Sequence, residues 1–270
     1  MAKFSIRVTW IVLALLFSTS PARPSTGHET GFLNRTVTVS GVEYRYQVYV
    51  PREFDRRRRW PVILFLHGGG EYGSDGLKQT NVGIATAIRK FPERFPAIVV
   101  FPQAKADGTP GWQQEGGKAA LAALDRSIKE FKGDPERTYL TGLSAGGNGS
   151  WYLASQYPER WAAALIVCGF ISKFTGRSTV IDYPALAGNE EDPYMYIARR
   201  TSSIPIWIYH GDKDDVVSPE ESRKMFAALK TVGADVRYTE VPGANHNSWD
   251  TAYSNTEVVE WMLKQRRAKQ

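Results

Sequence analysis

The residues best suited to chemistry lie in the stretch TGLSAGGNGS, Thr141 to Ser150, which contains the pattern G-x-S-x-G around Ser144. Residues typical of a strand precede this pattern, and residues typical of a helix follow it. In a sharp strand-to-helix turn, the residues two before and two after the serine come so close together that only glycine fits. The turn projects the hydroxyl away from the sheet, and the first amides of the helix point to the same place. A phosphate-binding loop would continue with Gly-Lys-Ser/Thr, which is missing here, so we predict that Ser144 is a nucleophile.

Ser144 needs a base to take its proton and an acid to orient that base. In enzymes with this turn, the partners follow along the chain in the order serine, acid, histidine. Only two of the four histidines come after Ser144. His246 lies in a polar loop after the last predicted strand and suits a general base, whereas His210 ends a predicted strand and is expected to be structural. The acid is expected directly after the strand that His210 ends, where there are three candidates: Asp212, Asp214 and Asp215.

A third requirement is a pair of N–H groups for the negative oxygen that forms when a carbonyl is attacked. The stretch LeuHisGlyGlyGlyGlu, Leu66 to Glu71, follows a predicted strand, and its glycines let the backbone approach a substrate closely. We assign the two donors of this oxyanion hole to the amides of Ala145 and Gly69, with Gly70 as the alternative to Gly69. His67 is expected to brace the loop by hydrogen bonding.

These residues need a scaffold, and the hydrophobic pattern predicts one. Alternating residues on either side of Ser40 and Gly41 predict an antiparallel hairpin. Unbroken apolar runs then suit strands covered on both faces, as in a parallel sheet. The predicted strands are 62–66, 97–101, 138–142, 163–168, 205–209 and 235–241, and the predicted helices are 118–131, 146–157, 219–232 and 256–267. Strands that alternate with helices predict a three-layer α/β fold with a mostly parallel sheet.

Length and composition indicate how the chain is organised. With 270 residues, 42% of them hydrophobic, the chain is large enough for one sizeable core. Residues 1–22 combine two basic residues, a short apolar run and a small-residue cleavage site, which is typical of a secretory signal peptide. We therefore expect a secreted or periplasmic protein with no stable membrane anchor after cleavage. The rest, 23–270, is expected to form a single catalytic domain in which the irregular segment 171–203 rims the site.

Charge and cysteine content argue against two other kinds of site. The net charge is +6, and part of the basic excess lies in Arg56 to Arg59. No nucleic-acid-reading motif accompanies this run, so we expect a solvated loop and no nucleic-acid partner. The single cysteine, Cys168, lies in a strand-like run and cannot form an internal disulfide. We expect a buried, inert thiol and predict no metal site.

Several blocks together resemble one family: LeuHisGlyGlyGlyGlu, PheProGln at 101–103 with Trp112, and the stretches 136–151, 205–217 and 236–253. They are similar to the secreted serine-esterase branch of the α/β-hydrolase superfamily. The similarity is greatest to the bacterial phospholipase/carboxylesterase-like proteins often called predicted peptidases, which are akin to feruloyl esterases and polyhydroxybutyrate depolymerases. The resemblance implies the α/β-hydrolase fold, hydrolysis of carboxylic esters through an acyl-enzyme, and no cofactor. It maps the family's acid loop, His-Gly-x-x-Asp-x-x-Val, onto Asp214, with Asp215 as the runner-up.

The substrate is less well defined than the reaction. We expect a small-molecule or polysaccharide-linked ester, with Trp112 and Trp249 as candidates to line its cleft and core packing as the alternative for both. Segment 171–203 is longer than in the relatives, so their substrates do not transfer directly. The nearest rival function is a serine peptidase of the prolyl-oligopeptidase type, which uses the same triad order but usually adds a large gating domain. A non-catalytic secreted binding protein is the rival from another class, and the oligomeric state is left open.

Overall fold

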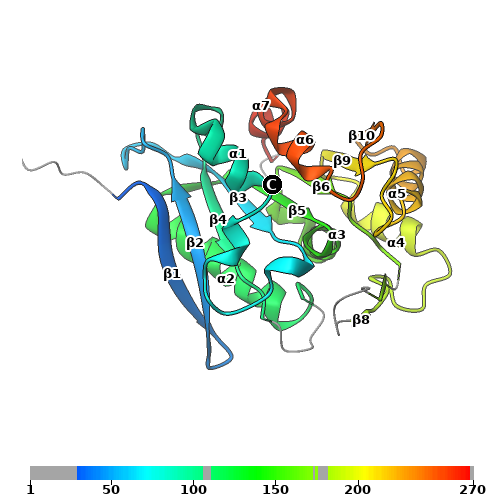
Figure 1. The fold of residues 1–270 in the computed structure, drawn as a ribbon, viewed down its shortest axis with the longest axis horizontal. Helices are drawn as coiled ribbons and strands as arrows, with labels where there is room; N and C mark the ends of the chain where they lie inside the picture. Colours follow the sequence, from blue (N-terminus) through cyan, green and yellow to red (C-terminus); the bar gives the residue numbers. More distant parts are fainter. Residues whose placement is uncertain (1–28, 106–110, 173, 176–181, 268–270) are drawn as a thin grey trace, which may run out of the picture.

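The computed structural model describes residues 29–105, 111–172, 174–175 and 182–267, and its centre is an eight-stranded sheet in the order β1-β2-β4-β3-β5-β6-β9-β10 (Figure 1). β1 pairs antiparallel with β2, and β2 with β4, while every pair from β4 to β10 is parallel. The strands of this sheet are β1 (Gly31–Val39), β2 (Val42–Val50), β3 (Trp60–Leu66), β4 (Ile98–Pro102), β5 (Gly133–Leu143), β6 (Ala163–Val167), β9 (Ile206–Gly211) and β10 (Val236–Val241). The predicted fold class is confirmed, including the hairpin at the start.

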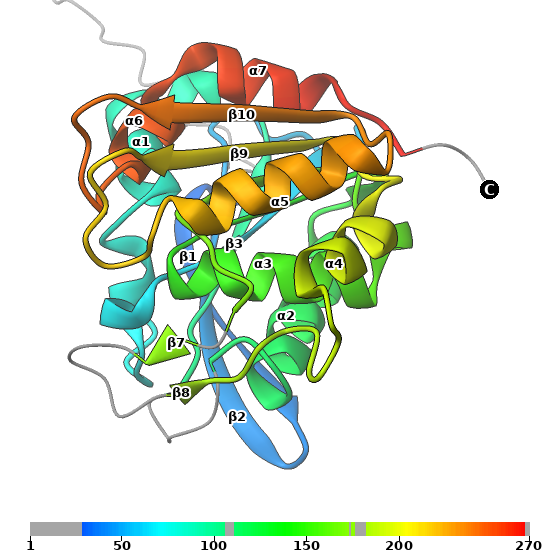
Figure 2. The same ribbon diagram turned by 90° about the vertical axis from the view of Figure 1, so that its right-hand side faces the viewer.

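Helices cover both faces of this sheet (Figure 2). Successive residues of β3 alternate between two hydrophobic cores, with Val62 and Leu64 in the first and Ile63 and Phe65 in the second. The first face carries α2 (Glu115–Glu130), α3 (Ala145–Gln156), α4 (Pro193–Thr201) and α5 (Glu220–Thr231), and the second carries α1 (Ile84–Lys90), α6 (Trp249–Ser254) and α7 (Thr256–Lys264). Burial on both sides is the reason that these strands are unbroken apolar runs.

Three helices depart from the sequence-based prediction. α1 and α6 have only seven and six residues, so the helical period barely repeats within them. α4 lies inside the segment 171–203, which was expected to be irregular, and its start is well capped. The Asp192 side chain accepts N–H groups from Tyr194 and Met195, and Pro193 takes the first position of the helix. The segment also contains a short antiparallel pair, β7 (Phe174–Thr175) and β8 (Asp182–Tyr183).

The other elements among the described residues are four short 3₁₀ helices: η1 (Gly69–Glu71), η2 (Lys78–Thr80), η3 (Pro92–Arg94) and η4 (Pro158–Arg160). Arg56 to Arg59 are exposed in the turn before β3. None of the helices in the described part of the chain has the length and apolar character needed to cross a lipid bilayer. The predicted signal peptide, residues 1–22, lies outside the described residues.

Candidate active site

The predicted serine, acid and base meet at the carboxyl edge of the sheet. Ser144 follows β5 and opens α3, Asp214 lies in the loop after β9, and His246 lies in the loop after β10. Because these strands run parallel, their carboxyl ends lie along one edge, and residues far apart in sequence become neighbours there. The distance along the chain from Ser144 to His246 is 102 residues.

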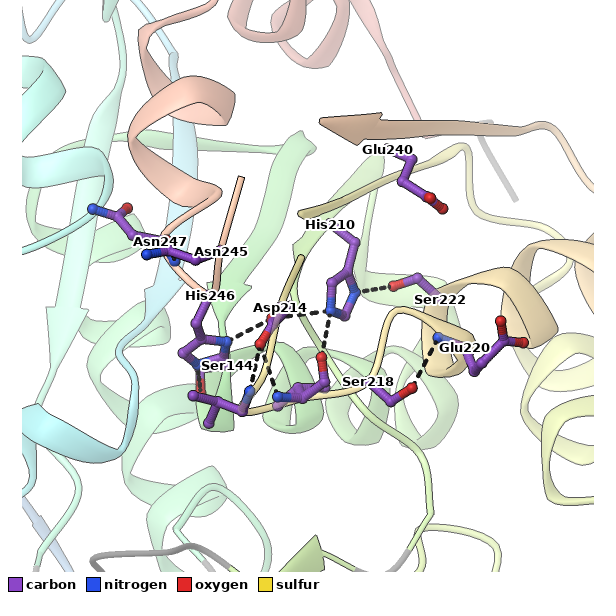
Figure 3. Close-up of polar contacts among 12 residues, drawn as sticks. Ser144, His210, Asp214, Ser218, Glu220, Ser222, Glu240, Asn245, His246 and Asn247 are labelled. Atoms are coloured by element: carbon purple, nitrogen blue, oxygen red, sulfur yellow. Dashed lines mark hydrogen bonds and ion pairs between the residues drawn. The ribbon is translucent and has the colours of Figure 1, made fainter. Parts of the chain in front are cut away.

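The three side chains form a continuous hydrogen-bonded chain (Figure 3). His246 Nε2 lies 2.9 Å from Ser144 Oγ, and His246 Nδ1 lies 2.7 Å from Asp214 Oδ2. An ionised carboxylate only accepts hydrogen bonds, so Nδ1 carries the ring proton and donates it to Asp214. Nε2 is then free to accept the hydroxyl of Ser144, which is the arrangement that a general base needs.

The backbone around Ser144 explains the glycines of its motif. Ser144 has φ 55° and ψ −118°, a conformation that side-chain-bearing residues rarely adopt. A Cβ on Gly142 would lie 2.2 Å from the Gly146 carbonyl oxygen, and a Cβ on Gly146 would lie 1.9 Å from the Leu66 carbonyl oxygen. The Ser144 amide donates to the carbonyl of Val167 at 3.0 Å, which fixes the turn to β6. The strained turn is thus held by contacts from both neighbouring strands.

Asp214 is the acid of the three candidates that reaches His246. Its side chain is fully buried, and Oδ1 accepts the amides of Val216 and Val217, each at 2.9 Å. Burial alone would raise the pKa of Asp214, but hydrogen bonds from His210, His246 and the Val217 amide outweigh it and hold the pKa well below its usual range. Asp214 is therefore ionised at neutral pH.

The other two acidic candidates lie elsewhere in the same loop. Asp215 is exposed. Asp212 accepts the amide of Gly243 at 2.7 Å and thereby ties the loop after β9 to the turn after β10. The contact of Asp212 is therefore that of a turn residue.

The glycine loop after β3 lies directly against the nucleophile. A Cβ on Gly68 would lie 3.6 Å from Ser144 Cβ and 2.8 Å from Leu143 Cδ1. Gly69 is the first residue of η1 and is partly exposed. Ala145 is the first residue of α3, where amides have no intrahelical acceptor. Ala145 adjoins Ser144 in the chain, and Gly69 follows Gly68 in the loop that lies against it; their role as oxyanion donors remains a prediction.

His67 braces this loop, as expected. Its Nε2 accepts the Ala104 amide at 3.0 Å, and its Nδ1 lies 2.7 Å from the Gly68 carbonyl oxygen. Since a carbonyl only accepts, Nδ1 carries the proton. Complete burial lowers the pKa of His67 to about 4, so the ring is neutral in the folded protein. This neutral ring links the loops after β3 and β4.

Trp112 and Trp249, predicted to line a substrate cleft, have different surroundings. Trp112 is 1% exposed, and its indole N–H donates to the His67 carbonyl at 3.0 Å. This burial corrects the expectation that Trp112 lines the substrate cleft. Trp112 packs in the core, which was the alternative for it, and its hydrogen bond to His67 supports the glycine loop. Trp249 is only partly buried, and its ring meets His246 edge-on with 5.4 Å between the centroids. Its contact with substrate remains a prediction.

Two further groups, the Glu71 carboxyl and the Cys168 thiol, lie beside the site. Glu71 Oε2 would lie 3.2 Å from a Cβ on Gly68, so the carboxyl group sits beside the glycine loop, and burial raises its pKa. The Cys168 thiol, the Asp214 carboxylate and the His246 ring place ligand-type atoms within 4.8 Å of one another. Burial raises the pKa of Cys168, so the thiol stays protonated, and Asp214 is already bonded to His246. This cluster is therefore poorly suited to hold a metal ion.

Comparisons with known proteins agree with this geometry. A family model, the prolyl oligopeptidase family, matches residues 106–266. An uncharacterized secreted protein of Arthroderma benhamiae is 27% identical over 76% of this chain and 23% of its own length. The uncharacterized peptidase YuxL of Bacillus subtilis is 26% identical over 82% of this chain and 36% of its own length. The chain thus spans little more than a third of these curated relatives at most.

A solved structure of a thermostable esterase has the same fold, with a TM-score of 0.73 and 29% sequence identity. The match covers 87% of this chain and 63% of the esterase. Peptidase-like and esterase-like proteins therefore both resemble this chain.

Proposed function

The chain belongs to the prolyl oligopeptidase family and is a serine hydrolase of the α/β-hydrolase superfamily, and from that premise we propose that it cleaves carboxylic esters. Its likeness to the structure of a thermostable esterase agrees with the resemblance of its sequence motifs to serine esterases. The observation that carries the proposal is the hydrogen-bonded series Ser144, His246 and Asp214. Similarity to an esterase at 29% identity supports esters over peptides.

The proposed reaction uses each contact of the series. His246 Nε2 takes the proton of Ser144 as Oγ attacks the ester carbonyl. The His246 ring is then charged, and Asp214 stabilises the charge through the bond to Nδ1. The amides of Ala145 and Gly69 bind the negative oxygen, and His246 returns its proton to the departing alcohol. Water then attacks the acyl-enzyme by the same route and releases the acid. No step needs a cofactor.

Turnover of two substrates tests this proposal. We expect purified protein to hydrolyse p-nitrophenyl acetate and to leave a peptide anilide largely intact. A fluorophosphonate probe should label the wild type and not the Ser144→Ala variant, whereas Ser155→Ala, which removes a buried hydroxyl at the far end of α3, should still be labelled. Cleavage of the anilide alone would assign the peptidase function instead. No turnover and no labelling of the folded protein would refute a serine hydrolase.

The peptidase alternative rests on a specific comparison, since YuxL, one of the relatives that cover most of this chain, is named as a peptidase. The natural ester and the site of action are also proposals. A panel of short acyl, long acyl, feruloyl and acetylated-sugar esters would identify the preferred substrate class. N-terminal sequencing of protein exported from a bacterial host would test cleavage after Ala22, which is expected from the sequence pattern of residues 1–22.

A further inference from the structure

A second histidine, His210, contacts Asp214, the acid of the proposed triad. His210 lies near the end of β9 and is completely buried. Its Nε2 is 3.1 Å from Asp214 Oδ2 and 3.0 Å from the Val217 carbonyl oxygen, while its Nδ1 is 2.7 Å from Ser222 Oγ (Figure 3). The sequence marked His210 only as a structural residue at a strand end, yet the structure places its ring on the acid itself.

The surroundings of His210 determine which ring nitrogen carries the proton. Both atoms near Nε2 are oxygens that only accept, so Nε2 must carry a proton. A ring with its one proton on Nε2 leaves Nδ1 as an acceptor for the Ser222 hydroxyl. In His246 the proton is on the other nitrogen, Nδ1, because that atom faces Asp214. Two imidazoles of opposite tautomer thus face one carboxylate oxygen, with the His210 Nε2–H shared between Asp214 Oδ2 and the Val217 carbonyl.

These contacts fill every hydrogen-bonding position of the Asp214 carboxylate. Oδ1 accepts the amides of Val216 and Val217, and Oδ2 accepts His210 and His246. A carboxylate offers about four acceptor sites. All of them are occupied, so neither oxygen has a free acceptor site at which another donor could draw the carboxylate away from His246. We propose that His210 is a positioning residue of the hydrolase, which holds Asp214 Oδ2 on His246, and that the Ser222 hydroxyl supports the required tautomer of His210 by donating to Nδ1. This inference rests on the proposed function.

Removal of His210 should affect the base as well as the acid. Asp214 has no solvent contact to replace the lost donor, since its side chain is fully buried. More of its negative charge would then act on His246 and favour the charged ring. The acid limb of the pH–rate profile should therefore move to higher pH. The carboxylate would also be freer to turn, which should lower kcat more than it raises KM.

Other ionisable groups near His210 are unchanged by this substitution. Glu240 lies opposite His210 in the β9–β10 pairing and is held by Arg223 of α5. Hydrogen bonds from Arg223 and Tyr238 lower the Glu240 pKa to about 2, so Glu240 stays ionised across the working range. The Cys168 thiol near Asp214 stays protonated because burial raises its pKa. A movement of the acid limb is therefore assignable to the pair His246 and Asp214.

Kinetics of matched variants test the inference. Partners that orient a catalytic ligand at metal sites are worth about 10–100-fold, and we expect a loss of this size in kcat for His210→Leu, with KM changed by less than about threefold. The acid limb should move to higher pH. His210→Gln can place an amide N–H near the position of Nε2 and should recover most of the activity. Ser222→Ala should show a smaller loss, and Ser155→Ala, which loses a buried hydroxyl far from the triad, should match the wild type. An unmoved or lowered acid limb in His210→Leu would overturn the inference, as would His210→Gln behaving like His210→Leu.

A second measurement needs no activity and separates the inference from the proposed function. The chain has four histidines, so long-range ¹H–¹⁵N correlation spectra of the wild type are simple to assign with single variants. We expect His67 and His246 to carry the proton on Nδ1, and His210 to carry it on Nε2. A proton on Nδ1 alone in His210 would overturn the inference even if the enzyme is active. The expected tautomers in a protein without esterase activity would instead refute the proposed function and leave the hydrogen-bonded network intact.

Discussion

Replacement of Asp214 by asparagine should prevent His246 from acting as a base while leaving the side-chain volume at position 214 nearly unchanged. The new amide has one oxygen and one NH₂ group, and the surroundings decide which goes where. The amides of Val216 and Val217 both donate to the Oδ1 position, so the amide oxygen must take it. The NH₂ group then faces His246 Nδ1, which was the donor in the wild type.

The consequence for His246 is a change of tautomer. Nδ1 must now accept, so the ring proton moves to Nε2 and points at Ser144 Oγ. A ring that donates to the nucleophile cannot take its proton. The same change in a serine protease lowers kcat by about 10⁴-fold, which corresponds to about 5.5 kcal/mol of lost transition-state stabilisation. His210 loses one of its two acceptors as well, because its Nε2–H would meet the new NH₂ group and keep only the Val217 carbonyl.

The assay is the initial rate of p-nitrophenyl acetate hydrolysis, with near-ultraviolet circular dichroism to check the fold. We expect Asp214→Asn to lose about 10³–10⁴-fold in kcat and the matched control Asp215→Asn to keep wild-type rates, because Asp215 is exposed. Substantial activity in Asp214→Asn, or a comparable loss in Asp215→Asn, would refute the assignment of the acid and the tautomer argument with it.

Four further outcomes are expected. The pKa of Asp214 is lower in the folded protein than in the unfolded chain. Its contribution to stability is therefore present above the unfolded value of about 3.9 and is lost as the pH falls further. The Tm advantage of the wild type over Asp214→Asn should shrink below pH about 4. Trp112→Phe leaves the buried His67 carbonyl without its donor, so urea unfolding should show a loss of about 1–3 kcal/mol, and an unchanged midpoint would contradict the bracing role. Cys168 should stay unreactive toward a disulfide reagent until the protein unfolds, because its thiol is buried with a raised pKa; rapid labelling of folded protein would count against this. Glu221→Ala removes the acceptor of the Ile171 and Ser172 amides and should raise KM for a bulky acyl ester relative to the acetate, without moving the acid limb.

The part of the site that the sequence predicts well is the part governed by local geometry and chain order. Gly142 and Gly146 are required by contacts within a few residues of Ser144 and across one neighbouring strand, so their spacing is readable directly. Asp214 and His246 follow predicted strands of a parallel sheet, and strand ends gather at one edge. The choice between Asp214 and Asp215 as the acid does not follow from chain order. It depends on the turn in which the Asp214 amide donates to the Gly211 carbonyl, and only a family resemblance pointed to it in advance.

The features that escaped prediction depend on tertiary contacts. Trp112 is buried because its ring lies against His67 and beside Gly149, where an added Cβ would come within 2.3 Å of Trp112 Cβ. No period or motif in the sequence reports that contact. His210 was assigned correctly to a strand end, but its contact with Asp214 arises because the loop after β9 folds back over four residues. A polar residue at such a position looks the same in sequence whether it faces a turn or a catalytic acid.

One turn of α5 links the proposed acid network to segment 171–203, which is expected from the sequence to rim the site. Glu221 accepts the amides of Ile171 and Ser172, where the chain leaves β6, and the hydroxyl of Tyr194 at the start of α4. Ser222, the next residue, turns about 100° around the helix and contacts His210 instead. Adjacent residues of α5 therefore contact segment 171–203, at its start and at the start of α4, and the His210 ring that contacts Asp214. Because the two contacts lie on different sides of α5, we expect changes in segment 171–203 to leave the position of His210 unaffected, as long as α5 stays packed on β9.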